Sequence, residues 1–149
     1  MSLLELIDEK TVRVPLAAQD KYGVIQELVE LLTSAGKVRD PAALYDAVLA
    51  REALGSTGLE EGIAVPHGKT DAVADVGLAI GVAPEGVEFD SVDGKPSKLF
   101  FLIAAPKDKA GPHIAALSDI ARLSRSKALL RALEAAGNEA ELIELLKGE

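Results

Sequence analysis

Residues 99–105 read Leu-Phe-Phe-Leu-Ile-Ala-Ala and form the most apolar segment of the chain. A short apolar run of this kind, ended by Pro106, is typical of a buried strand. We therefore expect it to be the central strand of a sheet. The segment 76–82 has the same apolar character with two glycines, and the segment 11–16 alternates apolar and polar residues as a first or edge strand does.

Helical patterns lie on either side of these strands. Residues 21–35 carry apolar side chains at helical spacing. A second helix is expected to begin at Pro41, with Asp40 as its N-cap and Gly55 marking its end. The last third of the chain, from residue 114 onward, again shows helical apolar stripes. Helices before and after a set of short strands predict a layered α/β domain rather than a helix bundle.

The composition narrows the class of protein. The 149 residues are 48% apolar and 27% charged, which predicts one ordered domain over residues 1–149. Aromatic residues make up 3% and there is no tryptophan, which argues against carbohydrate-binding and base-stacking surfaces. The formal net charge is −8 without a basic run, so we expect no binding of nucleic acid or anionic membranes.

The chain also lacks the features of secreted and membrane proteins. It has no cysteine, which rules out disulfides, thiolate catalysis and cysteine-based metal sites. Residues 1–10 mix three acidic residues with leucines and do not resemble a signal peptide. No apolar run approaches the ~20 residues that a spanning helix needs. The expected location is the cytoplasm.

One of the two histidines follows a short strand. Residues 62–69 read Gly-Ile-Ala-Val-Pro-His-Gly-Lys, and the apolar residues 63–65 have strand character. Pro66 is expected to end that strand, because proline has no N–H for the sheet ladder. His67 would then lie on a loop, with Gly68 allowing a tight turn beside it. The motif by itself is equally compatible with a turn that happens to contain a histidine.

The second histidine and one arginine are placed near the ends of expected helices. Pro112 fits the first position of a helix, so His113 would be one residue further in, where the helix dipole favours an anion and disfavours a charged imidazole. If the strands before His67 and His113 run parallel, the two side chains could face each other. Arg51, in the last turn of its helix, would add a cation suited to phosphate. Taken singly, His113 also fits a capping or surface histidine, and Arg51 a solvated cation.

Other chemistries fit these residues less well. Two histidines without cysteine make a sparse zinc site, although carboxylates could complete one. The chain has neither a P-loop nor a Gly-x-Ser-x-Gly nucleophile motif. A neutral imidazole is a good nucleophile near pH 7, and a second histidine or an arginine can neutralise phosphoryl oxygens. The remaining chemistry is attack of a histidine on phosphorus.

At this point the chain resembles a known family, the enzyme IIA domains of fructose–mannitol type from the bacterial sugar phosphotransferase system, which include nitrogen-regulatory IIA proteins. The matching blocks occur in the family's order over nearly the whole length. They are residues 51–52, 54–59, 62–69, 92–96, 99–106 and 113–118.

The resemblance implies a mixed sheet with helices on both faces, and no metal or nucleotide cofactor. It implies that His67 is phosphorylated on Nε2 by the histidine phosphocarrier HPr or its nitrogen-branch counterpart, and that it passes the group to a cysteine of a IIB domain. His113 and Arg51 would orient and neutralise the phosphoryl group. The hydroxyls of Ser56 and Thr57 are secondary candidates for phosphate hydrogen bonds.

Two other functions stay open beside the sugar phosphocarrier. One is a nitrogen-type regulatory protein whose phosphorylation state selects its binding partners, without sugar transport. The other is a domain that no longer accepts phosphate, which the set of Arg51, His67 and His113 argues against. Glu60 and Glu61 stand where many relatives carry a small residue, and they are candidates for altering partner choice.

Overall fold

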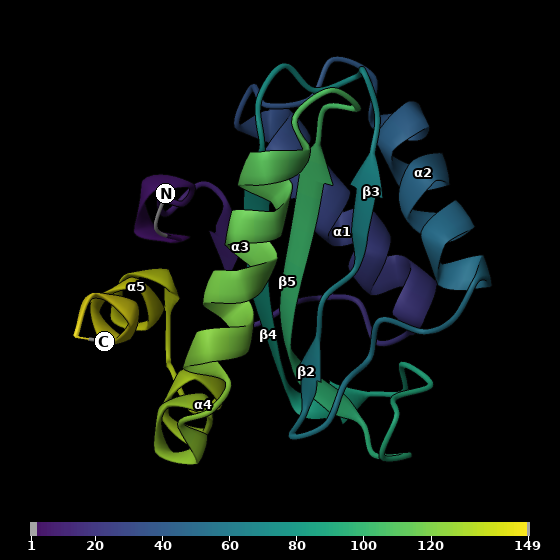
Figure 1. Ribbon diagram of the computed structural model, residues 1–149. Helices are drawn as coiled ribbons and strands as arrows, with labels where there is room; N and C mark the ends of the chain where they lie inside the picture. The colour runs from purple at the N-terminus through teal and green to yellow at the C-terminus, as the bar shows by residue number, and fades with distance from the viewer. Residues whose placement is uncertain (1–2, 149) are drawn as a thin grey trace.

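The computed structural model describes residues 3–148 (Figure 1); Met1, Ser2 and Glu149, which complete the predicted domain range, lie outside the described residues. The chain begins with the 3-10 helix η1 (Leu3–Glu5), strand β1 (Val12–Arg13) and helices α1 (Lys21–Ser34) and α2 (Pro41–Ala53). The next strands are β2 (Ile63–Ala64), β3 (His67–Lys69), β4 (Gly77–Val87) and β5 (Ser97–Ala105). Three helices follow: α3 (Ala110–Leu123), α4 (Lys127–Glu134) and α5 (Glu139–Lys147).

The sheet is mixed, as the family resemblance implies. Its strand order is β1-β4-β5-β2, and β3 also pairs with β5. β4 runs antiparallel to β5, β1 runs parallel to β4, and β2 and β3 both run parallel to β5. The segment 99–105 therefore does form an interior strand of the sheet, with β4 on one side and β2 and β3 on the other.

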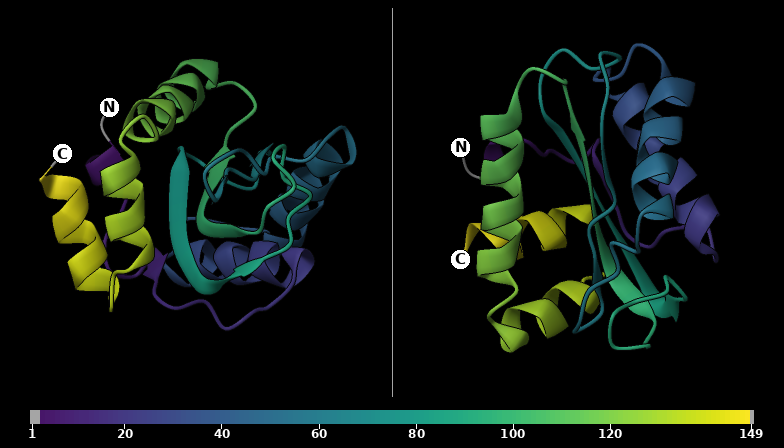
Figure 2. Two further views of the ribbon diagram at one scale, coloured as in Figure 1. Left: turned by 90° about the horizontal axis from the view of Figure 1, so that it is seen from below. Right: turned by 45° about the vertical axis from the view of Figure 1, so that its right-hand side comes forward.

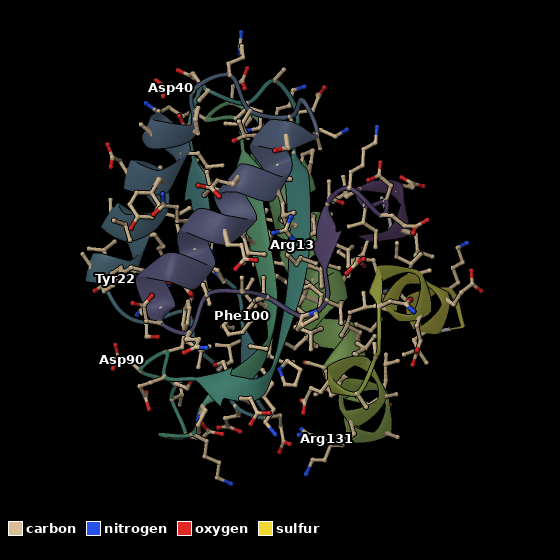
Figure 3. The ribbon with its side chains drawn as sticks, turned by 180° about the vertical axis from the view of Figure 1, so that it is seen from behind. Arg13, Tyr22, Asp40, Asp90, Phe100 and Arg131 are labelled. Carbon is tan, nitrogen blue, oxygen red and sulfur yellow. The ribbon has the colours of Figure 1, made fainter. Side chains whose placement is uncertain are left out.

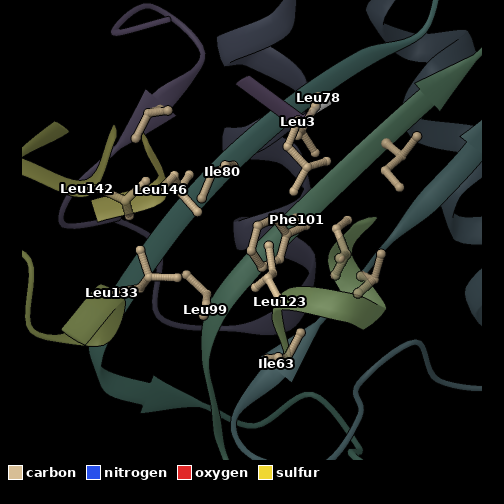
Figure 4. Close-up of a cluster of buried hydrophobic side chains, with 14 of the residues drawn as sticks. Leu3, Ile63, Leu78, Ile80, Leu99, Phe101, Leu123, Leu133, Leu142 and Leu146 are labelled. Carbon is tan, nitrogen blue, oxygen red and sulfur yellow. The ribbon is translucent and has the colours of Figure 1, made fainter. Parts of the chain in front are cut away.

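Helices cover both faces of this sheet (Figure 2): α1 and α2 lie on one face, and α3, α4 and α5 on the other. Alternate residues of β5 enter the two cores. Toward α3–α5 point Leu99, Phe101 and Ile103, in the cluster drawn in Figure 4. Toward α1 and α2 point Phe100, Leu102 and Ala104. This double burial is the reason why β5 is a continuous apolar run.

The predicted starts of α1 and α2 are confirmed, and both are capped by an aspartate. The Asp40 side chain accepts the backbone N–H of Ala43 at 3.2 Å, and Pro41 is the first residue of α2. Figure 3 shows Asp40 at this end of α2. An aspartate caps α1 in the same way, through a 2.7 Å bond between Asp20 and Gly23. Each carboxylate satisfies a backbone donor that a helix start leaves unpaired.

Two strands differ in length from the prediction. β1 is shorter than residues 11–16, because the N–H of Val14 donates to the Glu139 carboxylate at 2.7 Å instead of to a strand, and Pro15 has no N–H. β4 extends past residue 82 to Val87, with an irregularity in its pairing with β5.

His67 lies in a strand rather than on a loop, which corrects the prediction for this residue. Ile63 pairs with Leu99 and His67 pairs with Ile103, so β2 and β3 follow one register along β5. Pro66 interrupts the pairing without ending it, because its carbonyl accepts the Ile103 N–H at 3.0 Å. A proline on an edge strand loses only its donor.

Gly68 has a different role from the predicted tight turn. A Cβ at this position would lie 2.9 Å from the backbone nitrogen of Val48 and 3.0 Å from the carbonyl carbon of Ala47, both in α2. The missing side chain therefore lets α2 pack directly against β3. Neighbouring positions of β3 thus face α2 and α3 in alternation, with His67 on the α3 side.

Candidate functional site

The two histidines lie together at the start of β3 and the start of α3. Their ring centroids are 5.4 Å apart at an interplanar angle of 61°, an edge-to-face arrangement. The contact was expected if the strands near the two histidines run parallel. β3 does run parallel to β5, and α3 follows the end of β5. The sequence prediction that the two side chains face each other is confirmed.

The His67 ring is oriented by a backbone carbonyl. Its Nδ1 lies 2.9 Å from the oxygen of Val65, two residues earlier. A carbonyl oxygen can only accept, so in the neutral ring the proton is on Nδ1 and the lone pair is on Nε2. The half-buried imidazole therefore presents Nε2 as its nucleophilic atom.

His113 lies in a more buried setting than His67. It is 5% exposed, and its Nε2 is buried without a hydrogen-bond partner among the described residues. Burial lowers the pKa of His113 below its usual value of 6.5, and the electrostatic influence of His67 and of Lys69 lowers that pKa further. His113 is therefore held as a neutral imidazole near pH 7.

The start of α3 differs from the prediction. The helix begins at Ala110 and not at Pro112, so His113 is its fourth residue. Lys109 stands at the N-cap position without a side-chain capping bond, which removes the signal from which a start is normally recognised. Pro112 is tolerated because no helix N–H in the first turn needs an intrahelical acceptor. His113 still lies in the first turn, as predicted.

Arg51 lies in the wall of a pocket beside His67. This pocket has a volume of about 180 Å³, and Ser56 and Thr57 also line it. The apolar part of its wall comes from β2, its flanking residues and α3, namely Leu59, Ile63, Val65, Leu117, Ile120 and Ala121. Arg51 Nη1 donates to the carbonyl of Gly55 at 2.8 Å, which fixes the guanidinium at this place. The fold thus brings Arg51, Ser56, Thr57 and His67 into one pocket.

The hydroxyls of Ser56 and Thr57 form hydrogen bonds with other groups of the protein. Ser56 Oγ donates to the carbonyl of Phe89 at 2.5 Å and accepts the N–H of Gly58 at 3.0 Å. The Thr57 hydroxyl donates to the carboxylate of Glu52. Each hydroxyl has a single proton, which is already used in this arrangement. A phosphate hydrogen bond from either residue stays a prediction.

Glu52 and Lys69 also belong to the site region, although the sequence pattern alone does not assign a role to either of them. Glu52 is buried on the same stripe of α2 as Leu44 and Val48, at intervals of four residues. A carboxylate that continues an apolar stripe is a signal that sequence reasoning could have used. Lys69 lies two positions after His67 in β3, hence on the same side of the strand, and it is exposed.

Glu61 is engaged by α4 rather than free. Arg131 donates to its carboxylate and to its backbone carbonyl, each at 3.1 Å, and Lys127 lies 3.6 Å from the same carboxylate. Glu61 itself adopts a left-handed backbone conformation with φ of 63°. Of the two carboxylates singled out in the sequence, Glu60 is the more exposed.

Over residues 3–148, no group of three or more His, Asp or Glu side chains is arranged to hold a metal ion. Over the same residues, no helix has both the length and the apolar character that crossing a bilayer requires.

The chain matches the family model described as "Phosphoenolpyruvate-dependent sugar phosphotransferase system, EIIA 2" over residues 5–149. It is 36% identical over 146 residues to the fructose-specific EIIABC component of Bacillus subtilis, covering 98% of this chain and 23% of that protein. The chain thus spans about a quarter of the length of this relative.

Two solved structures have the same fold. The nitrogen regulatory protein IIA-Ntr of Neisseria meningitidis superimposes with a TM-score of 0.88 at 29% identity, covering 97% of this chain and 98% of that chain. Enzyme IIAMTL of Escherichia coli, solved in complex with phosphorylated enzyme IIBMTL, gives a TM-score of 0.82 at 28% identity, covering 96% and 98%.

The chain therefore belongs to the EIIA 2 family of the phosphotransferase system. That family contains sugar-specific and nitrogen-regulatory members, and its role is phosphoryl transfer.

Proposed function

We propose that the chain is a phosphocarrier that accepts a phosphoryl group on Nε2 of His67 from an HPr-like phosphohistidine protein and passes it to the cysteine of a IIB domain. The observation that carries this proposal is the 2.9 Å contact between His67 Nδ1 and the Val65 carbonyl. It leaves the lone pair on Nε2, and Arg51 lines the same pocket as His67.

The transfer needs no group beyond the two proteins. The Nε2 lone pair of His67 attacks the phosphorus of the donor's phosphohistidine. The new N–P bond forms as the donor's P–N bond breaks, and that electron pair returns to the donor imidazole. In the second transfer the IIB thiolate attacks the same phosphorus, and the bonding pair returns to Nε2 of His67.

Arg51 and His113 stabilise the charge that the phosphoryl group carries. Arg51 is always protonated and offers a planar set of donors that suits phosphoryl oxygens. His113 is neutral near pH 7, so it contributes one N–H donor without adding a repelling charge to His67. A neutral partner keeps the phosphoryl group transferable, because it does not hold the anion as strongly as a second cation does.

The acceptor is supported by one of the solved relatives. The structure that contains enzyme IIAMTL also contains phosphorylated enzyme IIBMTL, and this chain aligns with enzyme IIAMTL over 96% of its length. We infer that a IIB domain meets this chain over the pocket beside His67, because in-line transfer requires the two reacting atoms to approach the same phosphorus.

A regulatory role is the second candidate. The chain superimposes better on the nitrogen regulatory IIA-Ntr structure, at a TM-score of 0.88, than on enzyme IIAMTL, at 0.82. In this reading the same histidine is phosphorylated, and the phosphorylation state controls binding to target proteins.

The test is phosphorylation of the purified protein. It is incubated with phosphoenolpyruvate, enzyme I and HPr, or with the nitrogen-branch donors, and its intact mass is measured at neutral pH and after mild acid. An added phosphoryl mass that acid removes is expected. The absence of added mass with both donor sets would contradict the proposal. Loss of the label on addition of a IIB domain would favour the transport role over the regulatory one.

A further inference from the structure

A buried carboxylate organises the loop beside the site. The Glu52 side chain is 4% exposed, and its Oε1 lies 2.9 Å from Lys21 Nζ and 3.2 Å from the backbone nitrogen of Thr57. Its other oxygen accepts the Thr57 hydroxyl proton. A carboxylate at this depth is tolerable only because a cation and hydrogen-bond donors surround it.

Lys21 is itself held in a fixed environment. Its side chain is 11% exposed, and Nζ lies 4.8 Å from the centre of the Phe89 ring, within the range of a cation–π contact. Asp90, labelled in Figure 3, lies 3.6 Å from the same ammonium at the protein surface. The charge of Glu52 is thus balanced inside the fold.

Glu52 is connected to Arg51 and to His67 by two routes, and both begin at Thr57. In the first, Thr57 and Gly55 belong to one short loop, and the Gly55 carbonyl holds Arg51 at 2.8 Å. In the second, the Thr57 carbonyl accepts the N–H of Val65 at 3.0 Å, and the Val65 carbonyl holds Nδ1 of His67 at 2.9 Å. A displacement of Thr57 would therefore reach both the cation and the imidazole.

We propose that Glu52, neutralised by Lys21, is a positioning residue for phosphoryl transfer. It holds Thr57 with both carboxylate oxygens, and through Thr57 it fixes the Nδ1–H tautomer of His67 and the place of Arg51. This inference rests on the proposed function of His67. It also gives the Thr57 hydroxyl a role other than direct contact with phosphate.

The chain offers a matched control for the stability cost of changing a buried carboxylate. Glu27 is 9% exposed, the same as Glu52 when whole residues are compared. It accepts the backbone N–H groups of Ala17 and Ala18 at about 3 Å and pairs with Arg13 at 3.3 Å. None of these partners belongs to the loop or to the histidine pair, so Glu27→Gln perturbs packing and charge without reaching His67.

The test measures both the tautomer and the rate. Nitrogen NMR spectra of the unphosphorylated protein are expected to show the His67 proton on Nδ1 in the wild type. Glu52→Gln is expected to give a mixture of tautomers and to slow labelling by phospho-HPr about tenfold to a hundredfold, because small displacements of reacting groups cost this much. Glu27→Gln is expected to leave the spectrum and the rate unchanged, although both variants lower the melting temperature.

A second pair of variants examines the same link without removing a charge. Thr57→Val deletes the hydroxyl and keeps the backbone N–H, and it is expected to shift the His67 spectrum in the same direction as Glu52→Gln. Thr57→Ser keeps the hydroxyl and is expected to restore the wild-type spectrum.

Three outcomes separate the proposals. A wild-type spectrum and a wild-type rate in Glu52→Gln would overturn the positioning role, as would equal slowing in Glu27→Gln. If the wild-type protein accepts no phosphoryl group, the proposed function fails. In that case the tautomer comparison still decides whether Glu52 orients His67, because it uses the unphosphorylated protein.

Discussion

The regions around the two histidines differ although their rings touch. His67 begins an edge strand, is half-buried, and has one ring nitrogen fixed by the Val65 carbonyl. His113 lies in the first turn of a helix, is 5% exposed, and has an Nε2 without a partner among the described residues. One ring is thus oriented with a free lone pair at a pocket, and the other is kept neutral inside the protein. The difference supports the proposal that His67 accepts the phosphoryl group and that His113 assists it.

The largest effect is expected for loss of the acceptor. His67→Ala should abolish the acid-labile phosphoryl mass. His67 has an oriented ring and lines the pocket, whereas the second histidine, His113, is not among the residues that line it. Intact mass after incubation with phosphoenolpyruvate, enzyme I and HPr measures this. Retained labelling would show that another residue is phosphorylated and that the contrast between the two histidines does not identify the acceptor.

The next effect concerns the partner histidine. His113→Ala should still be labelled, but its transfer to a IIB domain should slow by about a hundredfold, the cost typical of removing a donor that stabilises a transition state. His113→Gln keeps an N–H donor and should recover part of the rate. Rapid-quench measurement of label loss gives both values. A wild-type rate in the alanine variant would reduce His113 to a structural residue.

The lowered pKa of His113 predicts a pH effect on stability. In the unfolded chain His113 takes up a proton near pH 6.5, whereas in the folded protein it does so only at lower pH. The contribution of neutral His113 to the free energy of unfolding is therefore fully present above pH 6.5 and is lost as the pH falls through the lower pKa of the folded protein. Glu134 has a pKa that burial raises above 4.5, so its contribution has the opposite sign and declines as pH rises. The difference between wild type and His113→Gln isolates the histidine.

Urea unfolding at a series of pH values from 8 to 5 gives this difference. The wild-type free energy of unfolding should fall more steeply below about pH 6.5 than that of the variant. Parallel curves for the two proteins would show that His113 is protonated as easily in the folded protein as in the unfolded chain.

The smallest effect is expected from a neighbouring charge. Lys69 is the last of the causes that lower the pKa of His113, after burial and His67. Lys69→Met should therefore raise the pKa of His113 slightly toward 6.5, and an NMR titration of the imidazole would detect the shift. Lys10→Met, on the N-terminal side of β1, is a control that should leave it unchanged. A downward shift in Lys69→Met would contradict the assigned sign.

The sequence predicted those parts of the fold that depend on local patterns. The apolar run 99–105 identified the interior strand, and Asp40 with Pro41 identified a helix start, because burial on both faces and capping leave direct traces in the residue order. Arg51, His67 and His113 stand out in the sequence for their chemistry, and the structure places Arg51 in the pocket that His67 lines and His113 against the His67 ring.

The errors arose where a partner distant in sequence decides the outcome or where a local signal is missing. Pro66 was expected to end a strand, but β5 accepts pairing on both sides of it. The start of α3 was misplaced because Lys109 provides no capping side chain. The role of Glu52 depends on Lys21 and Thr57, which meet it only in the folded chain.

Because β2 and β3 keep one register along β5, the position of a residue in this segment decides which face of the sheet its side chain is on. Residues 63, 65 and 67 face α3, whereas residues 64 and 68 face α2. At position 68 the α2 backbone is so close that there is no room for a side chain. Removing one residue between Ile63 and His67, with the register of Ile63 kept, would turn the imidazole toward α2 and bring Lys69 to the position of Gly68, where a Cβ meets the α2 backbone. Removing two would restore the side and shift the ring by one strand repeat. The site thus depends on the number of residues between Ile63 and His67 as well as on which residues they are.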